Sequence, residues 1–145
     1  MDILEHQISE SAAFLSAFTP QQALWREAPG EWNILEIVGH LADVERVFGY
    51  RALRIARADP VMWTGVEFEN YAAAANFLER PLGDVVAEFT AVRAAFIAFL
   101  SGLDAAAWQR RAPPDWTTRS VRAIAYAMAG HELHHRADIR RQHGG

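Results

Sequence analysis

The 145-residue sequence contains no cysteine and no lysine, and all 14 of its basic residues are arginine. Without cysteine, the chain can form no disulfide bond, offer no thiolate to a metal ion and provide no cysteine nucleophile. Without lysine, it cannot form the lysine Schiff base that some enzymes use as a covalent intermediate. Any thiol chemistry in this protein would therefore need a thiol supplied as a co-substrate.

Long hydrophobic runs and an excess of positive charge are also missing. No apolar stretch approaches the roughly 20 residues that a membrane-spanning helix needs, and the first residues lack the basic and apolar segments of a secretory signal. The formal net charge is −4, whereas non-specific binding to nucleic acid needs a basic surface. We therefore expect a cytoplasmic protein that binds neither membrane nor nucleic acid and acts on a small molecule.

The residues that are present predict one helical domain over residues 1–145. Hydrophobic residues make up 51% of the chain and charged residues 22%, which suits one apolar core with a polar surface. Apolar residues recur at spacings of three and four, the pattern of amphipathic helices, and no strand-like alternation occurs. The expected fold class is all-α, with four long helices over residues 2–18, 33–59, 84–102 and 117–142.

Local signals set the expected ends of these helices. Thr19 and Pro20 close the first helix, because proline cannot continue a helix. Asn33 and Glu36 stand at capping-box spacing at the start of the second helix. Asp84 is expected to cap the third helix, since aspartate is a favoured N-cap residue.

The segment over residues 60–83 is long for a connection in a compact domain. It is expected to contain a short helix over residues 71–78. Loops of this length are usually functional or form lids. Trp63 would then either wall a substrate pocket or pack the loop onto the bundle.

Two histidines on the expected fourth helix carry the strongest functional signal. Residues four apart lie one turn above each other on the same helix face, so His131 and His135 are both expected to point into the bundle. An unsatisfied buried polar group costs roughly 1–3 kcal/mol, and either hydrogen bonds within the core or a shared metal ion would satisfy both rings. His134 is rotated by about 100° and is expected to face solvent. These histidines belong to the stripe of this helix that is expected to face the core, which consists of Val121, Ile124, Met128, His131, His135 and Asp138.

A metal site needs a third ligand, and His40 is the best candidate. It lies beside the apolar seam of the second helix, one turn before Val44, and is expected to face inward. Three histidine ligands would leave a coordination position open, as in catalytic zinc sites. His6 is a reserve ligand, although it and His143 are expected to be solvated. Asp43 would orient an imidazole, add a further ligand or remain a surface carboxylate.

Residues 131–135 also match the H-E-x-x-H motif of zinc peptidases, in which the glutamate is the general base. Glu132 would be that base in this sequence. Only ten residues follow His135, too few for a downstream third ligand at the usual distance. No sheet edge is predicted that would hold a peptide substrate. We therefore do not expect a peptidase.

Two segments together resemble the DinB/YfiT-like superfamily: residues 31–41, EWNILEIVGHL, and residues 131–139, HELHHRADI. The resemblance extends over nearly the full chain in length, helix order and the placing of the histidines. It implies an up-down-down-up four-helix bundle, often a homodimer, with one divalent metal ion held by His40, His131 and His135. Zinc, nickel, manganese and iron are the candidate metals. The sequence has Ala137-Asp138 where many relatives carry Gly-Gln, which leaves the hydrogen bonding around His135 open.

Three functions remain open at this point. The first is a metal-dependent S-transferase, in which the metal lowers the pKa of a low-molecular-weight thiol that attacks a small electrophile. Bacillithiol, mycothiol and glutathione are the thiols that the resemblance suggests. The second is a metal-dependent hydrolase with Glu132 or Asp43 as the base, although Glu132 lies about 100° from the ligand face. The third is a non-enzymatic metal-binding protein of a stress response.

Overall fold

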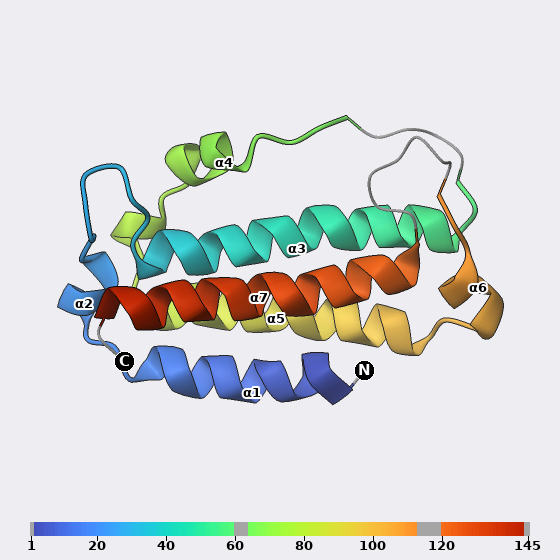
Figure 1. Ribbon diagram of the computed structural model, residues 1–145, viewed down its shortest axis with the longest axis horizontal. Helices are drawn as coiled ribbons and strands as arrows, with labels where there is room; N and C mark the ends of the chain where they lie inside the picture. The colour runs from blue at the N-terminus through green and yellow to red at the C-terminus, as the bar shows by residue number, and fades with distance from the viewer. Residues whose placement is uncertain (1, 60–63, 113–119, 144–145) are drawn as a thin grey trace.

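Four long helices run side by side along the longest axis of the molecule (Figure 1). The structure is a computed structural model and describes residues 2–59, 64–112 and 120–143. Within these ranges there is no strand, only an isolated bridge between Arg111 and Ser120. The long helices are α1 (Asp2–Ser16), α3 (Ile34–Ala56), α5 (Leu82–Ser101) and α7 (Val121–His143). The predicted all-α fold is therefore confirmed.

The order of the helices is up-down-down-up, as expected. Helices α1 and α7 run in one direction and α3 and α5 in the other (Figure 1). The parallel pair α3 and α5 needs a connection that returns along the bundle, and this connection carries α4 (Phe68–Ala74) and the 3-10 helix η1 (Phe77–Glu79). The one helix expected over residues 71–78 is thus two shorter ones. Trp63 lies outside the described residues.

Two short helices cover the ends of the bundle, α2 (Pro20–Leu24) and α6 (Ala105–Gln109). Pro20 does follow the end of the first long helix, but it also begins α2. Proline is well tolerated in a first helical turn, where its missing N–H would have no intrahelical partner. Thr19 caps this helix, because its side chain accepts a hydrogen bond from the Gln22 backbone N–H.

The expected helix starts differ in how well they agree with the structure. Asn33 caps α3 through the predicted capping box with Glu36. Asp84 does not cap α5, which begins at Leu82 after Pro81. Its carboxylate lies instead in the first turn, where negative charge interacts favourably with the helix dipole. The expected start of the fourth helix at residue 117 or 118 lies outside the described residues.

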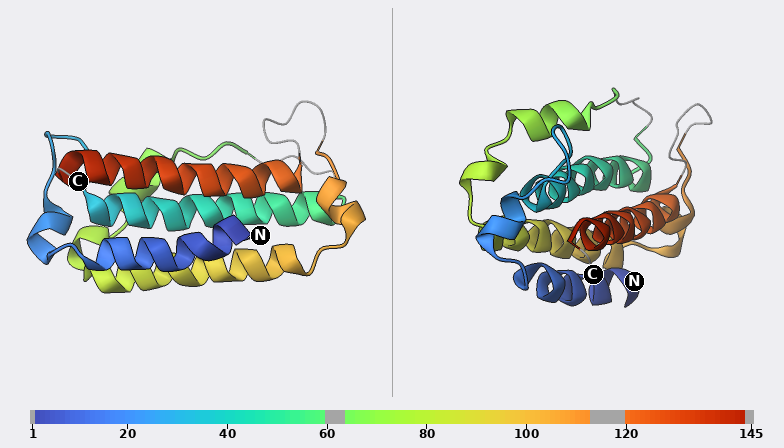
Figure 2. Two further views of the ribbon diagram at one scale, coloured as in Figure 1. Left: turned by 60° about the horizontal axis from the view of Figure 1, so that its bottom comes forward. Right: turned by 60° about the vertical axis from the view of Figure 1, so that its left-hand side comes forward.

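Helix α3 is the central element of the core. It packs against α5 and α7, while α1 packs mainly against α5, and the oblique right-hand view of Figure 2 shows the four helices around one core. Apolar side chains fill the space between the helices; fully buried ones include Ile34, Val38, Ala52, Val85, Leu100, Val121 and Ile124. None of the helices in the described part of the chain is both long enough and apolar enough to cross a membrane.

Candidate metal centre

The structure brings together the three predicted metal ligands. His40 lies on α3 and His131 and His135 lie on α7, and these two helices pack against each other. The Nε2 atom of His131 lies 3.3 Å from that of His40 and 3.1 Å from that of His135. Within the described ranges, these three residues form the one group of histidines and carboxylates with the spacing of metal ligands.

The nitrogen spacing fits a divalent metal ion. Imidazole nitrogens lie about 2.0–2.1 Å from zinc, so two ligands of a tetrahedral ion lie about 3.3 Å apart. The Nε2 separations of His40, His131 and His135 agree with this value. Zinc, copper, iron and nickel all accept imidazole nitrogen, so the donor set alone does not select the metal.

The environment keeps the three imidazoles neutral at neutral pH. Burial, and then the neighbouring imidazoles, lower the pKa of both His40 and His131 to about 4. Burial also lowers the pKa of His135, while the carboxylate of Asp138 opposes this effect. Neutral imidazole is the form that binds a metal ion. The site is therefore ready to bind a cation without first losing protons.

The two candidate ligands on α7, His131 and His135, lie on the flank of the buried stripe of this helix and not within it. The expected continuation of the stripe through them was wrong, because the buried positions continue as Glu132, Arg136 and Ile139. His131 and His135 are both half-buried. The candidate centre thus lies between α3 and α7, beside the buried core and not within it.

Aromatic side chains surround His40. The ring of Trp32, just before α3, lies 4.6 Å from the His40 ring, and the ring of Phe68 on α4 lies 5.6 Å from it. Tyr71, one turn further along α4, contacts Phe68 and is exposed. The crossover segment therefore contacts the candidate site through Phe68.

Two acidic residues, Asp43 and Asp138, each follow a candidate ligand by three positions. Asp138 lies behind His135, with Oδ2 3.6 Å from the His135 Nδ1 atom and 3.4 Å from the Nε2 atom of His134. Asp43 was expected to orient an imidazole, to add a further ligand or to remain a surface carboxylate, and in the structure its carboxylate contacts Arg46 at 3.3 Å. Burial raises the pKa of Asp43, and Arg46 opposes this effect. Among the described residues, Asp138 is thus the carboxylate that lies within 4 Å of a candidate ligand, although the His135 Nδ1 atom has no hydrogen-bond partner there.

Glu132 faces the centre of the bundle. It is fully buried, accepts a hydrogen bond from Ser11 and forms an ion pair with Arg93 at 2.6 Å. This placement agrees with the expected rotation of Glu132 by about 100° from the helix face that carries His131 and His135. The carboxylate that was a candidate base is thus held by partners on α1 and α5, and it is not part of the group that can hold a metal.

The remaining histidines are not part of the group with the spacing of metal ligands. His6 is exposed, and its Nδ1 donates to the Asp2 carbonyl oxygen. His134 has 70% of its side chain exposed, as expected. His143 was expected to be solvated, but it is half-buried against the rings of Phe18 and Trp25.

Comparisons with known proteins agree with the fold and the sequence pattern. None of the curated proteins compared with the chain matches it. The fold is similar to that of YfiT from Bacillus subtilis, with a TM-score of 0.77 and 16% identity over 99% of this chain and 85% of that one. YfiT is described as "a probable metal-dependent hydrolase with an unusual four-helix bundle topology". At this identity the likeness concerns the fold alone. The family model of the DinB superfamily matches residues 3–139, and the chain therefore belongs to the DinB superfamily.

Proposed function

We propose that this protein is a metal-dependent S-transferase that joins a low-molecular-weight thiol to a small electrophile. The observation that carries the proposal is the convergence of three neutral imidazoles, those of His40, His131 and His135, at a half-buried site beside aromatic rings. A divalent ion bound there would supply the Lewis acidity that lowers the pKa of a thiol. In the overall reaction the thiol proton passes to solvent, a sulfur–carbon bond forms and the leaving group departs.

The charge of the ligand set supports a thiol as the co-substrate. Three neutral histidines leave the double positive charge of the ion uncompensated, which favours an anionic further ligand such as a thiolate. The chain has no cysteine of its own to take that place. Trp32 and Phe68 beside His40 add an apolar wall for the carbon skeleton of the electrophile.

The positions of the acidic side chains favour thiol activation over water activation. Hydrolysis at neutral pH benefits from a general base within hydrogen-bond reach of the nucleophile. Glu132 is paired with Arg93, and Asp43 is paired with Arg46. A thiol has an ordinary pKa of about 8.5, so it needs less help to ionise. The hydrolase alternative is supported by the description of YfiT and stays a second candidate.

Purified protein loaded in turn with zinc, nickel, manganese and iron tests the proposal. Each form is incubated with an alkylating or arylating electrophile and with bacillithiol, mycothiol or glutathione, and the conjugate is measured by mass spectrometry. We expect metal-dependent conjugate formation with at least one thiol, and its loss in the His135→Ala variant. Metal-dependent hydrolysis of ester substrates without any conjugate would favour the hydrolase. Inactivity in every combination would favour a non-enzymatic metal-binding role.

A further inference from the structure

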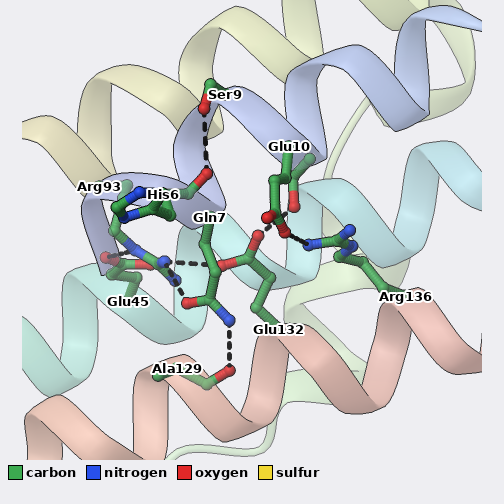
Figure 3. Close-up of polar contacts among 10 residues, drawn as sticks. His6, Gln7, Ser9, Glu10, Glu45, Arg93, Ala129, Glu132 and Arg136 are labelled. Atoms are coloured by element: carbon green, nitrogen blue, oxygen red, sulfur yellow. Dashed lines mark hydrogen bonds and ion pairs between the residues drawn. The ribbon is translucent and has the colours of Figure 1, made fainter. Parts of the chain in front are cut away.

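A buried network of polar side chains lies at the centre of the bundle, apart from the histidines. Its central residue is Arg93 of α5, which is 1% exposed. The Arg93 Nε atom donates to Glu45 Oε1 of α3 at 2.5 Å, and its Nη1 atom donates to Glu132 Oε2 of α7 at 2.6 Å. One guanidinium therefore joins the two helices that carry the histidines (Figure 3).

Side chains of α1 complete this network. Gln7 accepts from Arg93 Nη1 at 3.3 Å and donates to the Ala129 carbonyl oxygen of α7 at 3.0 Å. The Ser11 hydroxyl donates to Glu132. Both α1 residues are buried. All four long helices thus contribute to the network, and Figure 3 shows the side chains of Gln7, Glu45 and Glu132 converging on Arg93.

Stability alone does not account for a network of this kind. Buried ion pairs lose their hydration, and well-packed apolar residues of the same volume are often at least as stabilising. A guanidinium does add directionality, because its N–H groups form a rigid planar fork. The hydrogen bonds of Arg93 to Glu45 and Glu132 therefore form together at one relative position of α3, α5 and α7.

The network and the histidines join the same two helices at neighbouring levels. Glu132 directly follows His131, and Glu45 lies five residues after His40. With a rise of about 1.5 Å per residue, these distances are about 1.5 Å along α7 and about 7.5 Å along α3. A change of α7 register by one residue would rotate it by about 100°, break its bond to Arg93 and turn His131 away from His40.

We propose that Arg93, Glu45 and Glu132 are positioning residues for the metal centre. Their hydrogen bonds hold the rotation and register of α7 against α3, so that the imidazoles of His40 and His131 already face each other before an ion binds. This inference rests on metal binding by the histidines, which is part of the proposed function, and does not depend on which reaction follows.

Cobalt(II) binding to the purified protein tests the inference, since both the affinity and the visible spectrum report on the ligand geometry. The triple variant Arg93→Met/Glu45→Leu/Glu132→Leu replaces the network with apolar side chains. We expect it to keep the helical circular dichroism spectrum but to bind cobalt(II) about tenfold more weakly. This is the low end of the roughly 10- to 100-fold range for groups bonded directly to metal ligands, because the network's hydrogen bonds hold the helices and do not reach the imidazoles. A folded triple variant with wild-type affinity and spectrum would overturn the inference.

Two further variants keep the test decisive if the triple variant does not fold. Arg93→Lys retains one positive charge but not the planar fork, and we expect weaker cobalt(II) binding and an altered spectrum. Glu132→Gln can still accept from Arg93 and donate to Ser11, and it should bind nearly as the wild type does. Wild-type cobalt(II) affinity and spectrum in Arg93→Lys would contradict the proposed role.

Two control variants show whether weaker cobalt(II) binding comes from lost positioning, from lower overall stability or from a wrong set of ligands. Ile124→Ala removes buried apolar volume from α7 two turns before the network. It should lower the melting temperature while leaving cobalt(II) affinity of the folded protein unchanged; a weakening equal to that of Arg93→Lys would contradict the inference. His135→Ala tests the ligand set by itself. If this variant binds cobalt(II) as tightly as the wild type, the metal site is wrong whatever the Arg93 variants show.

Discussion

The orientation of a ligand imidazole depends on the group behind its second ring nitrogen. Asp138 lies behind His135, with 3.6 Å between its carboxylate and the His135 Nδ1 atom. At 3.6 Å the two atoms form an electrostatic contact and not a hydrogen bond, and the His135 Nδ1 atom has no hydrogen-bond partner in the described part of the chain. A small shift of the Asp138 carboxylate would make the hydrogen bond that fixes a ligand ring and increases the basicity of its ligating nitrogen. Asp43 has a similar chain distance from His40 but is paired with Arg46. The two aspartates therefore form a natural pair for comparison.

We expect Asp138→Ala to weaken cobalt(II) binding about tenfold, because loss of the partner behind a ligand typically has an effect of this size. Asp43→Ala is the control, and it should change the affinity less than twofold. Both values come from competitive titration of the purified variants with a chromophoric chelator. Equal weakening in the two variants would show that Asp138 has no special relation to His135.

At the scale of the elements, the crossover approaches α3 very closely beside the metal centre. A Cβ atom added at Gly39 would lie 2.4 Å from the ring of Phe77 in η1. Glycine at this position lets the buried Phe77 ring pack directly against the backbone next to His40. Gly130 lies on α7 next to His131, but a Cβ atom there would have no neighbour within 4 Å.

We expect Gly39→Ala to lower the free energy of unfolding by about 1–3 kcal/mol, as overpacking typically does. Gly130→Ala should raise it by about 0.5–1 kcal/mol, because alanine is the better helix former and has room at this position. Urea denaturation of the two variants measures both changes. Equal effects of the two substitutions would mean that η1 does not pack on α3 as described.

The sequence predicted the elements whose signals are local. The capping box of Asn33 and Glu36 lies within one turn, and the histidine pair on α7 lies within one turn as well. The start of α5 was misplaced because Pro81 and Asp84 both suit a helix N-terminus, and the local sequence does not separate the two choices. Proline at position 20 was understood as the end of one helix but not as the beginning of another.

The parts of the site that sequence reasoning missed depend on contacts between distant segments. The placement of Phe68 against His40 requires the path of the crossover, and no local pattern reveals it. A buried Arg93 is unexpected because arginine is usually exposed, and its two glutamates lie on other helices. Asp138 had a usable signal, since it lies three residues after His135 and on the expected stripe.

At the scale of the whole molecule, the outer face of α7 is unusual for a surface helix. Tyr126 is 67% exposed and Leu133 is 50% exposed, and these residues lie two turns apart on the same side. The exposed positions around them include the small residues Ala123, Ala127, Gly130 and Ala137, and also Arg122, one turn before Tyr126, and His134. Small residues let a second helix approach closely, so this face suits a second copy of the chain. The homodimer suggested by the sequence resemblance stays a proposal.

If the outer face of α7 forms the dimer, light scattering at micromolar concentration should give twice the 16.2 kDa mass of one chain. Tyr126→Arg/Leu133→Arg should shift the protein to the monomer, because it places charge in an apolar contact. Tyr50→Arg/Leu53→Arg is the control on α3, where Arg54 already lies over the exposed ring of Tyr50. A monomeric wild-type protein, or dissociation by the control variant alone, would exclude the α7 face as the interface.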